Sequence, residues 1–166
     1  MVMDKIKGQE LMESICEMKY DENIARNLFK QILEGIAYMH EHGVCHRDIK
    51  PSNILVLDDK SSIVITDFNI SKYFANKAFK MLTYTGTEAF KAPEMLEAAF
   101  YNEKIDLWAA GCVLFTMLAG SMPFFDENLP RLHRAIKNAE YDMKSEPWPS
   151  ISESAKDLIR KLICID

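Results

Sequence analysis

Glycine is scarce in this chain, with six residues in 166. No two of them are closer than eight positions, so the sequence contains no G-x-G-x-x-G segment. Glycine-rich loops of that kind lie over the phosphates of a bound nucleotide, because a backbone without Cβ atoms can approach them closely. The scarcity therefore excludes a glycine-rich phosphate cover within these residues.

Long apolar runs and paired cysteines are also missing. No run approaches the roughly eighteen apolar residues that a transmembrane helix requires, and Met1 does not open a signal peptide. The four cysteines lie singly, without C-x-x-C spacing, at Cys16, Cys45, Cys112 and Cys164. This pattern favours reduced thiols in a cytoplasmic protein, and it does not exclude the nucleus. The net charge of -5 argues against nucleic acid and anionic membranes as partners.

Three segments have the patterns of helices, and an apolar content of 48% is enough for one compact domain. After Asp21, a suitable N-cap, apolar residues recur every four positions as far as Gly43, which predicts an amphipathic helix. The segment 104–119 is apolar almost all round, which predicts a helix inside the core. Ser152 can cap a final helix with apolar residues at Ala155, Leu158, Ile159 and Leu162.

Two β-branched runs, 54–57 and 63–66, flank a turn-like segment at 58–61 and predict a β-hairpin. This hairpin sets Asn53 and Asp67 at its two ends. We therefore expect a mainly α fold with a small β-hairpin, in which two residues fourteen positions apart come close enough to share a metal ion.

The segment 46–53 reads His-Arg-Asp-Ile-Lys-Pro-Ser-Asn, and it is followed by Asp-Phe-Asn at 67–69 and Ala-Pro-Glu at 92–94. It places three different functional groups within six residues. Asp48 can accept the proton of a hydroxyl, Lys50 can lie against a phosphate, and Asn53 offers an oxygen to a magnesium ion. Asp67 supplies a second, charged magnesium ligand. The motifs in this order predict phosphoryl transfer from ATP with Mg2+ as cofactor.

On these motifs the chain resembles eukaryotic protein kinases, whose catalytic loop, D-F-G and A-P-E segments follow the same order. Lys50, two places after Asp48, is typical of serine/threonine kinases. The segments Gly-Gln-Glu-Leu at 8–11, Trp-Pro-Ser-Ile-Ser at 148–152 and Ala-Lys-Asp-Leu-Ile at 155–159 are most similar to calmodulin-regulated and calcium-dependent kinases. The resemblance runs from the first residue to the last, and it implies the fold of a protein kinase C-terminal lobe with protein serines and threonines as substrates.

The resemblance also implies what lies outside residues 1–166. Residues 1–4 correspond to the end of the last strand of the N-terminal lobe and the hinge, and no V-A-I-K-like lysine precedes the catalytic loop. In the family, Glu94 pairs with an arginine a few residues beyond the position of Asp166. We therefore expect a C-terminal lobe alone, which begins at the hinge, lacks the N-terminal β lobe and stops before the last helix. Such a lobe should be nearly inactive and should tend to self-associate.

The family assigns roles to particular side chains. By resemblance, Thr87 bonds to Asp48 and Lys50 and completes the catalytic set with Asn53. The implied nucleotide contacts are the backbone amide of Ile6, the carboxylate of Glu10 for the ribose, Leu55 as the floor of the adenine site, and Asp67. For Glu10, a plain helix-start charge is the alternative.

Other residues are implied to support the site or to regulate it. His46 packs beneath Phe68, Arg47 receives a regulatory phosphate, and Asp106 holds the backbone of the catalytic loop. In the apolar helix, the Asp106 carboxylate would be costly unless it accepted hydrogen bonds. The implied phosphorylation site is Thr83, with Tyr84 and Thr85 as alternatives. The remaining histidines, His40, His42 and His133, show no ligand spacing and are interpreted as ordinary surface or helix residues.

Two departures from the family pattern leave a second function open. Asn69 replaces the glycine of D-F-G, at a position whose backbone often needs conformational freedom. Ser52 replaces a glutamate that many kinases with basic substrates carry, so the substrate sequence preference does not follow from the resemblance. The first hypothesis is an active serine/threonine kinase domain, and the alternative is a non-catalytic, pseudokinase-like binding or scaffold module.

Overall fold

The computed structural model describes residues 6–17, 20–74, 86–97 and 100–165, so Thr83 lies outside the described residues. The helices are α1 (Leu11–Glu17), α2 (Glu22–Glu41), α3 (Pro93–Leu96), α4 (Ile105–Ala119), α5 (Leu129–Lys137) and α6 (Glu153–Leu162). The 3-10 turns are η1 (Pro51–Asn53), η2 (Glu88–Phe90) and η3 (Trp148–Ser150). The strands are β1 (Gly8–Glu10), β2 (Val44–Cys45), β3 (Ile54–Leu57), β4 (Ile63–Ile65) and β5 (Lys72–Tyr73).

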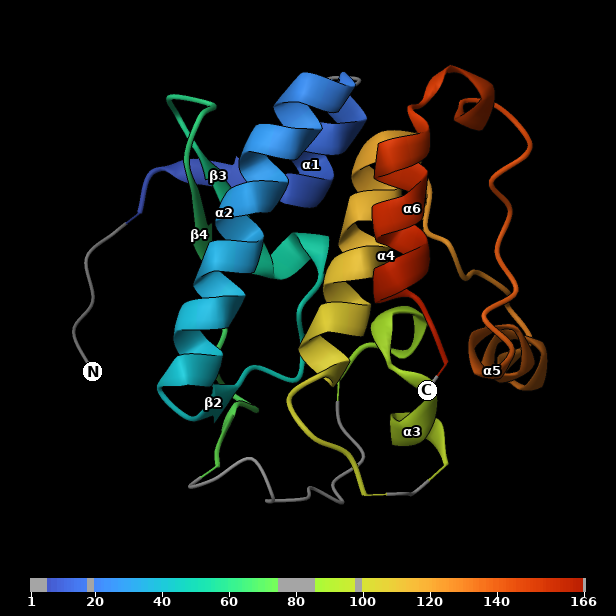
Figure 1. Cartoon of the computed structure of the whole chain (residues 1–166). Helices are drawn as coiled ribbons and strands as arrows, with labels where there is room; N and C mark the ends of the chain where they lie inside the picture. Colours follow the sequence, from blue (N-terminus) through green and yellow to red (C-terminus); the bar gives the residue numbers. More distant parts are fainter. Residues whose placement is uncertain (1–5, 18–19, 75–85, 98–99, 166) are drawn as a thin grey trace.

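Three long helices form the centre of the molecule. In Figure 1, α4 lies between α2 and α6, with the β1, β3 and β4 sheet on the α2 side and α3 and α5 on the α6 side. The expected mainly α fold with a small β-hairpin is therefore confirmed. None of the helices among the described residues is both long enough and apolar enough to cross a membrane.

Helix α2 begins and ends as the sequence predicts. The Asp21 carboxylate accepts a hydrogen bond from the backbone N–H of Ile24 at 2.8 Å, which caps the first turn. The helix ends at Glu41, and Gly43 follows with a φ of 73°. A Cβ at Gly43 would lie 2.7 Å from the carbonyl oxygen of Phe74, so both the backbone angle and the space favour glycine.

The core helix α4 is buried on nearly every side, as its uniform apolar sequence predicts. It packs closely on α6, because Gly111 of α4 lies against Leu162 and Ile163. Helix α6 is capped by Ser152, whose Oγ accepts a hydrogen bond from the N–H of Ala155 at 3.2 Å. Both predicted helices are present.

The β3–β4 hairpin is also present, and it pairs Ile54 with Ile65. Strand β1 was not expected from the sequence, and it adds to the free edge of β3 and sets Glu10 opposite Leu55. The short β2–β5 pair was not expected either. The hairpin matters for the site, because it fixes where the ends of the loop 46–53 and of the segment 67–69 lie.

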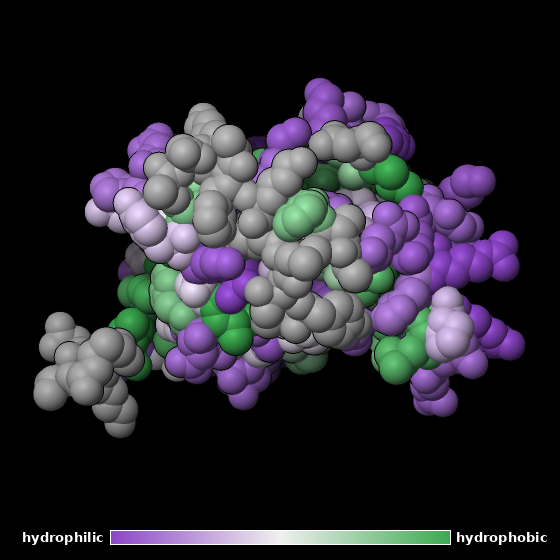
Figure 2. Space-filling model, turned by 90° about the horizontal axis from the view of Figure 1, so that it is seen from below, coloured by the Kyte–Doolittle hydropathy of each residue, from purple (hydrophilic) through white to green (hydrophobic). Residues whose placement is uncertain are grey.

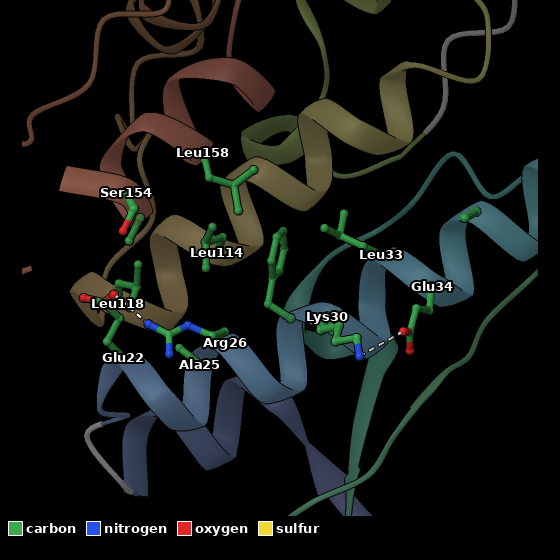
Figure 3. Close-up of a pocket in the computed structure, with 13 residues that line it drawn as sticks. Glu22, Ala25, Arg26, Lys30, Leu33, Glu34, Leu114, Leu118, Ser154 and Leu158 are labelled. Carbon is green, nitrogen blue, oxygen red and sulfur yellow. Dashed lines mark hydrogen bonds and ion pairs between the residues drawn. The ribbon is translucent and has the colours of Figure 1, made fainter. Parts of the chain in front are cut away.

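A groove of about 480 Å³ opens between α2, α4 and α6. Leu33, Leu114 and Leu158 project into it from the three helices, and the Lys30–Glu34 ion pair of α2 also lines it (Figure 3). In Figure 2, which shows another face from below, most of the residues that the structure describes are hydrophilic, with separate hydrophobic patches among them. The groove shares no lining residue with the candidate site described next.

Candidate active site

The loop 46–53 is held by a single carboxylate on α4. Asp106 is 1% exposed, and its Oδ2 accepts a hydrogen bond from the backbone N–H of His46 at 2.8 Å. Its Oδ1 accepts one from the backbone N–H of Arg47 at 2.9 Å. His40, near the end of α2, contacts Oδ2 through its Nε2 at 2.9 Å. The buried Asp106 carboxylate thus has hydrogen-bond partners on both oxygens, which offset the cost of its burial and fit its predicted supporting role.

Arg47 has a positive φ of 71°, which is uncommon for a residue with a Cβ. Its Nε donates to the carbonyl oxygen of Ile70, and its Nη1 lies 3.4 Å from the hydroxyl of Tyr101. Gly86 approaches the carbonyl oxygen of Arg47 so closely that a Cβ there would lie 2.8 Å away. These contacts, together with the hydrogen bond from the Arg47 N–H to Asp106, fix the backbone conformation of Arg47 and therefore the position of the next residue, Asp48.

The four side chains predicted to be catalytic lie together. Asp48 Oδ2 is 2.8 Å from Lys50 Nζ and 2.9 Å from Asn53 Nδ2. Asp48 Oδ1 accepts hydrogen bonds from the backbone N–H of Thr87 at 3.0 Å and from its hydroxyl at 3.2 Å. Lys50 Nζ also donates to Thr87 Oγ1 at 2.8 Å. The structure therefore joins the loop 46–53 to a threonine 39 residues further along the chain.

The Asp48 carboxyl has a lowered pKa. Burial opposes its ionisation, but the hydrogen bond and charge of Lys50, together with hydrogen bonds from Thr87 and Asn53, outweigh burial and lower the pKa below its usual value. Asp48 is consequently ionised at neutral pH. An ionised, partly exposed carboxylate can accept a proton from a hydroxyl placed beside it.

His46 is fully buried and its ring is bonded on both sides. Nε2 donates to the carbonyl oxygen of Thr66 at 2.9 Å, and Nδ1 accepts from the backbone N–H of Asp48 at 3.3 Å. This pair of partners fits the neutral tautomer with the proton on Nε2. The ring also lies edge-on to Phe68, with ring centroids 4.8 Å apart. His46 is thus placed as a loop anchor, with both ring nitrogens occupied.

The candidate metal ligands both flank the open end of the β3–β4 hairpin. The backbone N–H of Thr66 donates to the carbonyl oxygen of Asn53 at 2.8 Å, which brings the neighbouring Asp67 to the same end. Asn53 Nδ2 donates to two acceptors on Asp48, so the amide oxygen is the atom that can face a cation. An amide oxygen and the exposed carboxylate of Asp67 suit Mg2+, which prefers oxygen ligands and uses few from protein.

The segment after Asp67 explains how Asn69 is accommodated. Asp67 has a positive φ of 62°, whereas Asn69 does not. The backbone N–H of Asn69 lies 3.4 Å from Asp67 Oδ1. In this conformation, therefore, the backbone does not require a glycine at position 69.

The other predicted residues are placed less tightly around this centre. Strand pairing sets the exposed Glu10 beside the half-buried Leu55, and Ile6, 40% exposed, precedes β1. Phe68 is 48% exposed. Glu94, in the first turn of α3, lines a separate cavity of about 490 Å³ that also includes Trp108. No contact among the described residues brings Glu94 to Asp48.

Four residues near this centre make contacts that the sequence did not predict: His40, Glu88, Lys91 and His133. His40 is no ordinary helix residue, because it contacts Asp106. Lys91 is 3% exposed and pairs with Glu88, and Glu88 in turn contacts His133 of α5. Their spacing carries no signal for these contacts. Only the position of Lys91, between Thr87 and Ala-Pro-Glu, sets it apart from other lysines, a residue type that is mostly exposed.

Within the described residues, no group of three or more histidine, cysteine, aspartate or glutamate side chains is arranged to hold a metal. A magnesium ion at Asn53 and Asp67 would therefore need additional oxygen ligands from a bound substrate or from water, as is usual for this metal.

Comparison with known proteins agrees with the geometry. The protein kinase domain family matches residues 1–166. Across its whole length the chain is 40% identical to calcium/calmodulin-dependent protein kinase type 1 of Macrobrachium nipponense and 39% identical to that of Caenorhabditis elegans, and it covers 48% of each. It is 38% identical to human serine/threonine-protein kinase H1, of which it covers 40%. The chain thus spans about half the length of the curated relatives it matches, and it belongs to the protein kinase family.

Proposed function

We propose that the chain is the catalytic and substrate-binding lobe of a serine/threonine protein kinase, which transfers the γ-phosphoryl group of ATP to protein hydroxyls. The observation that carries this proposal is the ionised Asp48 carboxylate, held between Lys50, Asn53 and Thr87. Each of these groups has a role in phosphoryl transfer, whereas a non-catalytic surface would not require them in this arrangement.

In the proposed reaction, the serine or threonine hydroxyl of the substrate donates its proton to Asp48. Its oxygen forms a bond to the γ-phosphorus as the bond to the leaving ADP oxygen breaks. Lys50 lies within hydrogen-bond distance of both Asp48 and Thr87, so its ammonium charge is close to the phosphoryl group in transfer. Asn53 and Asp67 would hold Mg2+, which neutralises charge on the phosphates.

We also propose that residues 1–166 form one C-terminal lobe that acts with a separate ATP-binding lobe. The support is the lack of a glycine-rich loop and the exposure of Phe68, Ile6 and Glu10 on the side where nucleotide would bind. Positioning supplies most of the rate in phosphoryl transfer. The isolated chain should therefore show little activity and bind Mg-ATP more weakly than the micromolar range in a calorimetric titration.

The experiment that tests the function joins the chain, through its N-terminus, to an ATP-binding lobe of the protein kinase family. Transfer of labelled phosphate to a mixed set of serine and threonine peptides is then measured, alongside nucleotide binding. We expect transfer that Asp48→Asn abolishes and that Asp126→Asn, in an exposed loop, leaves unchanged. A fusion that binds Mg-ATP and peptides but transfers no phosphate would contradict the proposal and favour the scaffold module.

A cytoplasmic location is part of the same proposal. Its support is that Cys45 and Cys112 are buried, free thiols and that Cys16 and Cys164 are exposed, free thiols. Protein substrates, rather than nucleic acid, are the proposed partners because the net charge is -5.

A further inference from the structure

A second charged cluster lies next to the Asp48 site and joins η2 to α5. Glu88 Oε1 lies 2.5 Å from Lys91 Nζ, and Glu88 Oε2 lies 2.8 Å from His133 Nε2. The two charged partners differ in exposure: the Lys91 side chain is 3% exposed, whereas that of Glu88 is 31% exposed. The Lys91 ammonium therefore lies beneath the surface, and the Glu88 carboxylate is the charged group that a bound molecule would contact.

The position of Glu88 along the chain places it beside the substrate. Thr87, the residue before it, binds the Asp48 carboxylate through both its N–H and its hydroxyl. Adjacent residues have Cα atoms about 3.8 Å apart, so Glu88 follows directly on the contact to Asp48. Lys91, Thr87 and Asp48 also line one small cavity. A peptide whose hydroxyl reaches Asp48 must therefore lay a flanking residue along Glu88.

The cluster gives that flanking position a chemical preference. The nearly buried Lys91 ammonium requires a partner, which fixes the Glu88 carboxylate in place. A large apolar substrate side chain seated here would remove water from the ion pair without replacing its hydrogen bonds. An acidic side chain would face a like charge, and a basic one would meet the partly exposed Glu88 carboxylate.

We propose that Glu88, held by Lys91 and His133, is a specificity-determining residue that favours substrates with a basic side chain beside the phosphoacceptor over apolar or acidic ones. This inference rests on the proposed function to the extent that a hydroxyl-bearing peptide occupies the Asp48 site. It concerns peptide binding by this lobe, so it can be tested without phosphate transfer.

The test measures peptide affinity for the isotopically labelled 166-residue chain by NMR titration. The peptides carry one serine in a neutral background, with Lys, Gln, Leu or Glu placed on one side of it or the other. At one of the two sides, we expect Lys to bind about three- to five-fold tighter than Leu or Glu, the size typical of one partly exposed charge contact. Binding of no peptide, or Leu ranked above Lys on both sides, would overturn the inference.

Matched variants separate the charge from the fold. Glu88→Gln keeps the size of the side chain and should reduce the Lys preference to less than about two-fold. The double variant Glu88→Leu/Lys91→Met removes both members of the ion pair together and should rank Leu above Lys. Glu97→Gln, which loses only an exposed pair with Lys137 at 3.4 Å, is the control and should keep the wild-type ranking.

Retention of the wild-type ranking by both Glu88 variants, with unchanged circular dichroism, would overturn the proposal. Phosphate transfer by the fused protein reports on the proposed function separately. A chain that ranks the peptides as expected but never transfers phosphate would sink the kinase proposal and leave the specificity assignment standing.

Discussion

Asp106 accepts a hydrogen bond from the backbone N–H of Arg47 at 2.9 Å, and Arg47 has a φ of 71°. The acceptor lies on α4 and the donor lies in the loop that carries Asp48, 59 residues earlier. A backbone conformation that costs free energy by itself persists where surrounding contacts determine it, and this carboxylate supplies such a contact.

Replacing Asp106 should therefore destabilise the fold as well as the loop. In Asp106→Asn, only one side-chain oxygen remains to accept the bonds from His46 and Arg47, and one buried N–H loses its partner. We expect a loss of about 1–3 kcal/mol in the free energy of unfolding, measured in urea. Asp126→Asn, which alters an exposed turn, is the control. A variant as stable as the wild type would show that the loop does not depend on this acceptor.

Lys50 should control the charge of Asp48. Lys50→Met removes the cation 2.8 Å from the Asp48 carboxylate, so the pKa of Asp48 should rise while burial continues to oppose ionisation. Carboxyl-carbon NMR of the chain, titrated from neutral to acidic pH, measures this change. In Lys30→Met, which removes only an exposed pair with Glu34, the Asp48 titration should stay the same. An unchanged Asp48 pKa in Lys50→Met would contradict the proposed electrostatics.

The link between α2 and α6 should be sensitive to acid. Glu22 accepts hydrogen bonds from the side chain of Ser152 at 2.6 Å and from its backbone N–H at 3.0 Å, and these bonds lower the pKa of Glu22. The folded pKa is below the unfolded one. Its contribution to stability is therefore present above the unfolded pKa, about 4.3 for glutamate, and is lost as the pH falls through the folded pKa.

Urea unfolding of Glu22→Gln from pH 7 to pH 3 tests this link. The wild type should be the more stable at neutral pH, and the difference should shrink as the pH falls below about 4. Glu34→Gln loses an exposed ion pair of 3.6 Å and serves as the matched control on the same helix. A stability difference for Glu22→Gln that does not vary with pH would count against the linkage.

Gly111 and Gly35 are both helical glycines, and they should respond oppositely to alanine. A Cβ at Gly111 would lie 2.7 Å from Leu162 Cβ and 2.8 Å from Ile163 Cγ1, so Gly111→Ala should lose about 1–3 kcal/mol by overpacking. A Cβ at Gly35 would meet only the flexible end of Ile65 at 3.0 Å, so the helix propensity of alanine should offset the contact. Thermal unfolding compares the two, and equal melting temperatures would contradict the packing argument.

The isolated chain should self-associate through the side that bears Phe68. The Phe68 ring is 48% exposed and Ile6 is 40% exposed. Two further apolar residues of the candidate site, Leu55 and Ile70, are half-buried. Residues 1–4, which the family resemblance places at the hinge, lie outside the described residues. In sedimentation experiments, Phe68→Ser should reduce association. Phe125→Ser removes another ring, 73% exposed near α5, and should have no such effect.

Local signals predicted the parts of the fold that depend on nearby residues. Asp21 and Ser152 each cap a helix that begins at the next residue. The two β-branched runs of the hairpin pair with each other. In contrast, β1 consists of Gly-Gln-Glu, which carries no strand signal, and its pairing is imposed by the open edge of β3. Its position could not be read from its own sequence.

The sequence motifs predicted which residues form the candidate site. The spacing of residues along the chain did not predict the contacts between residues far apart in the sequence. Thr87 came from family resemblance alone, because nothing local indicates that it meets Asp48. His40 was missed because its partner, Asp106, lies on another element. Lys91 was missed although its partner Glu88 is only three residues away, because lysine is a residue type that is mostly exposed and its burial comes from the tertiary fold.

The bond from Asp106 also ties the loop to the assembly of the fold. Because the acceptor for His46 and Arg47 belongs to α4, these two loop amides become protected only when α4 docks against α2. Their hydrogen exchange should therefore report separation of two helices rather than local fluctuation of a surface loop. The candidate active site and the helical core should consequently form and come apart as one cooperative unit.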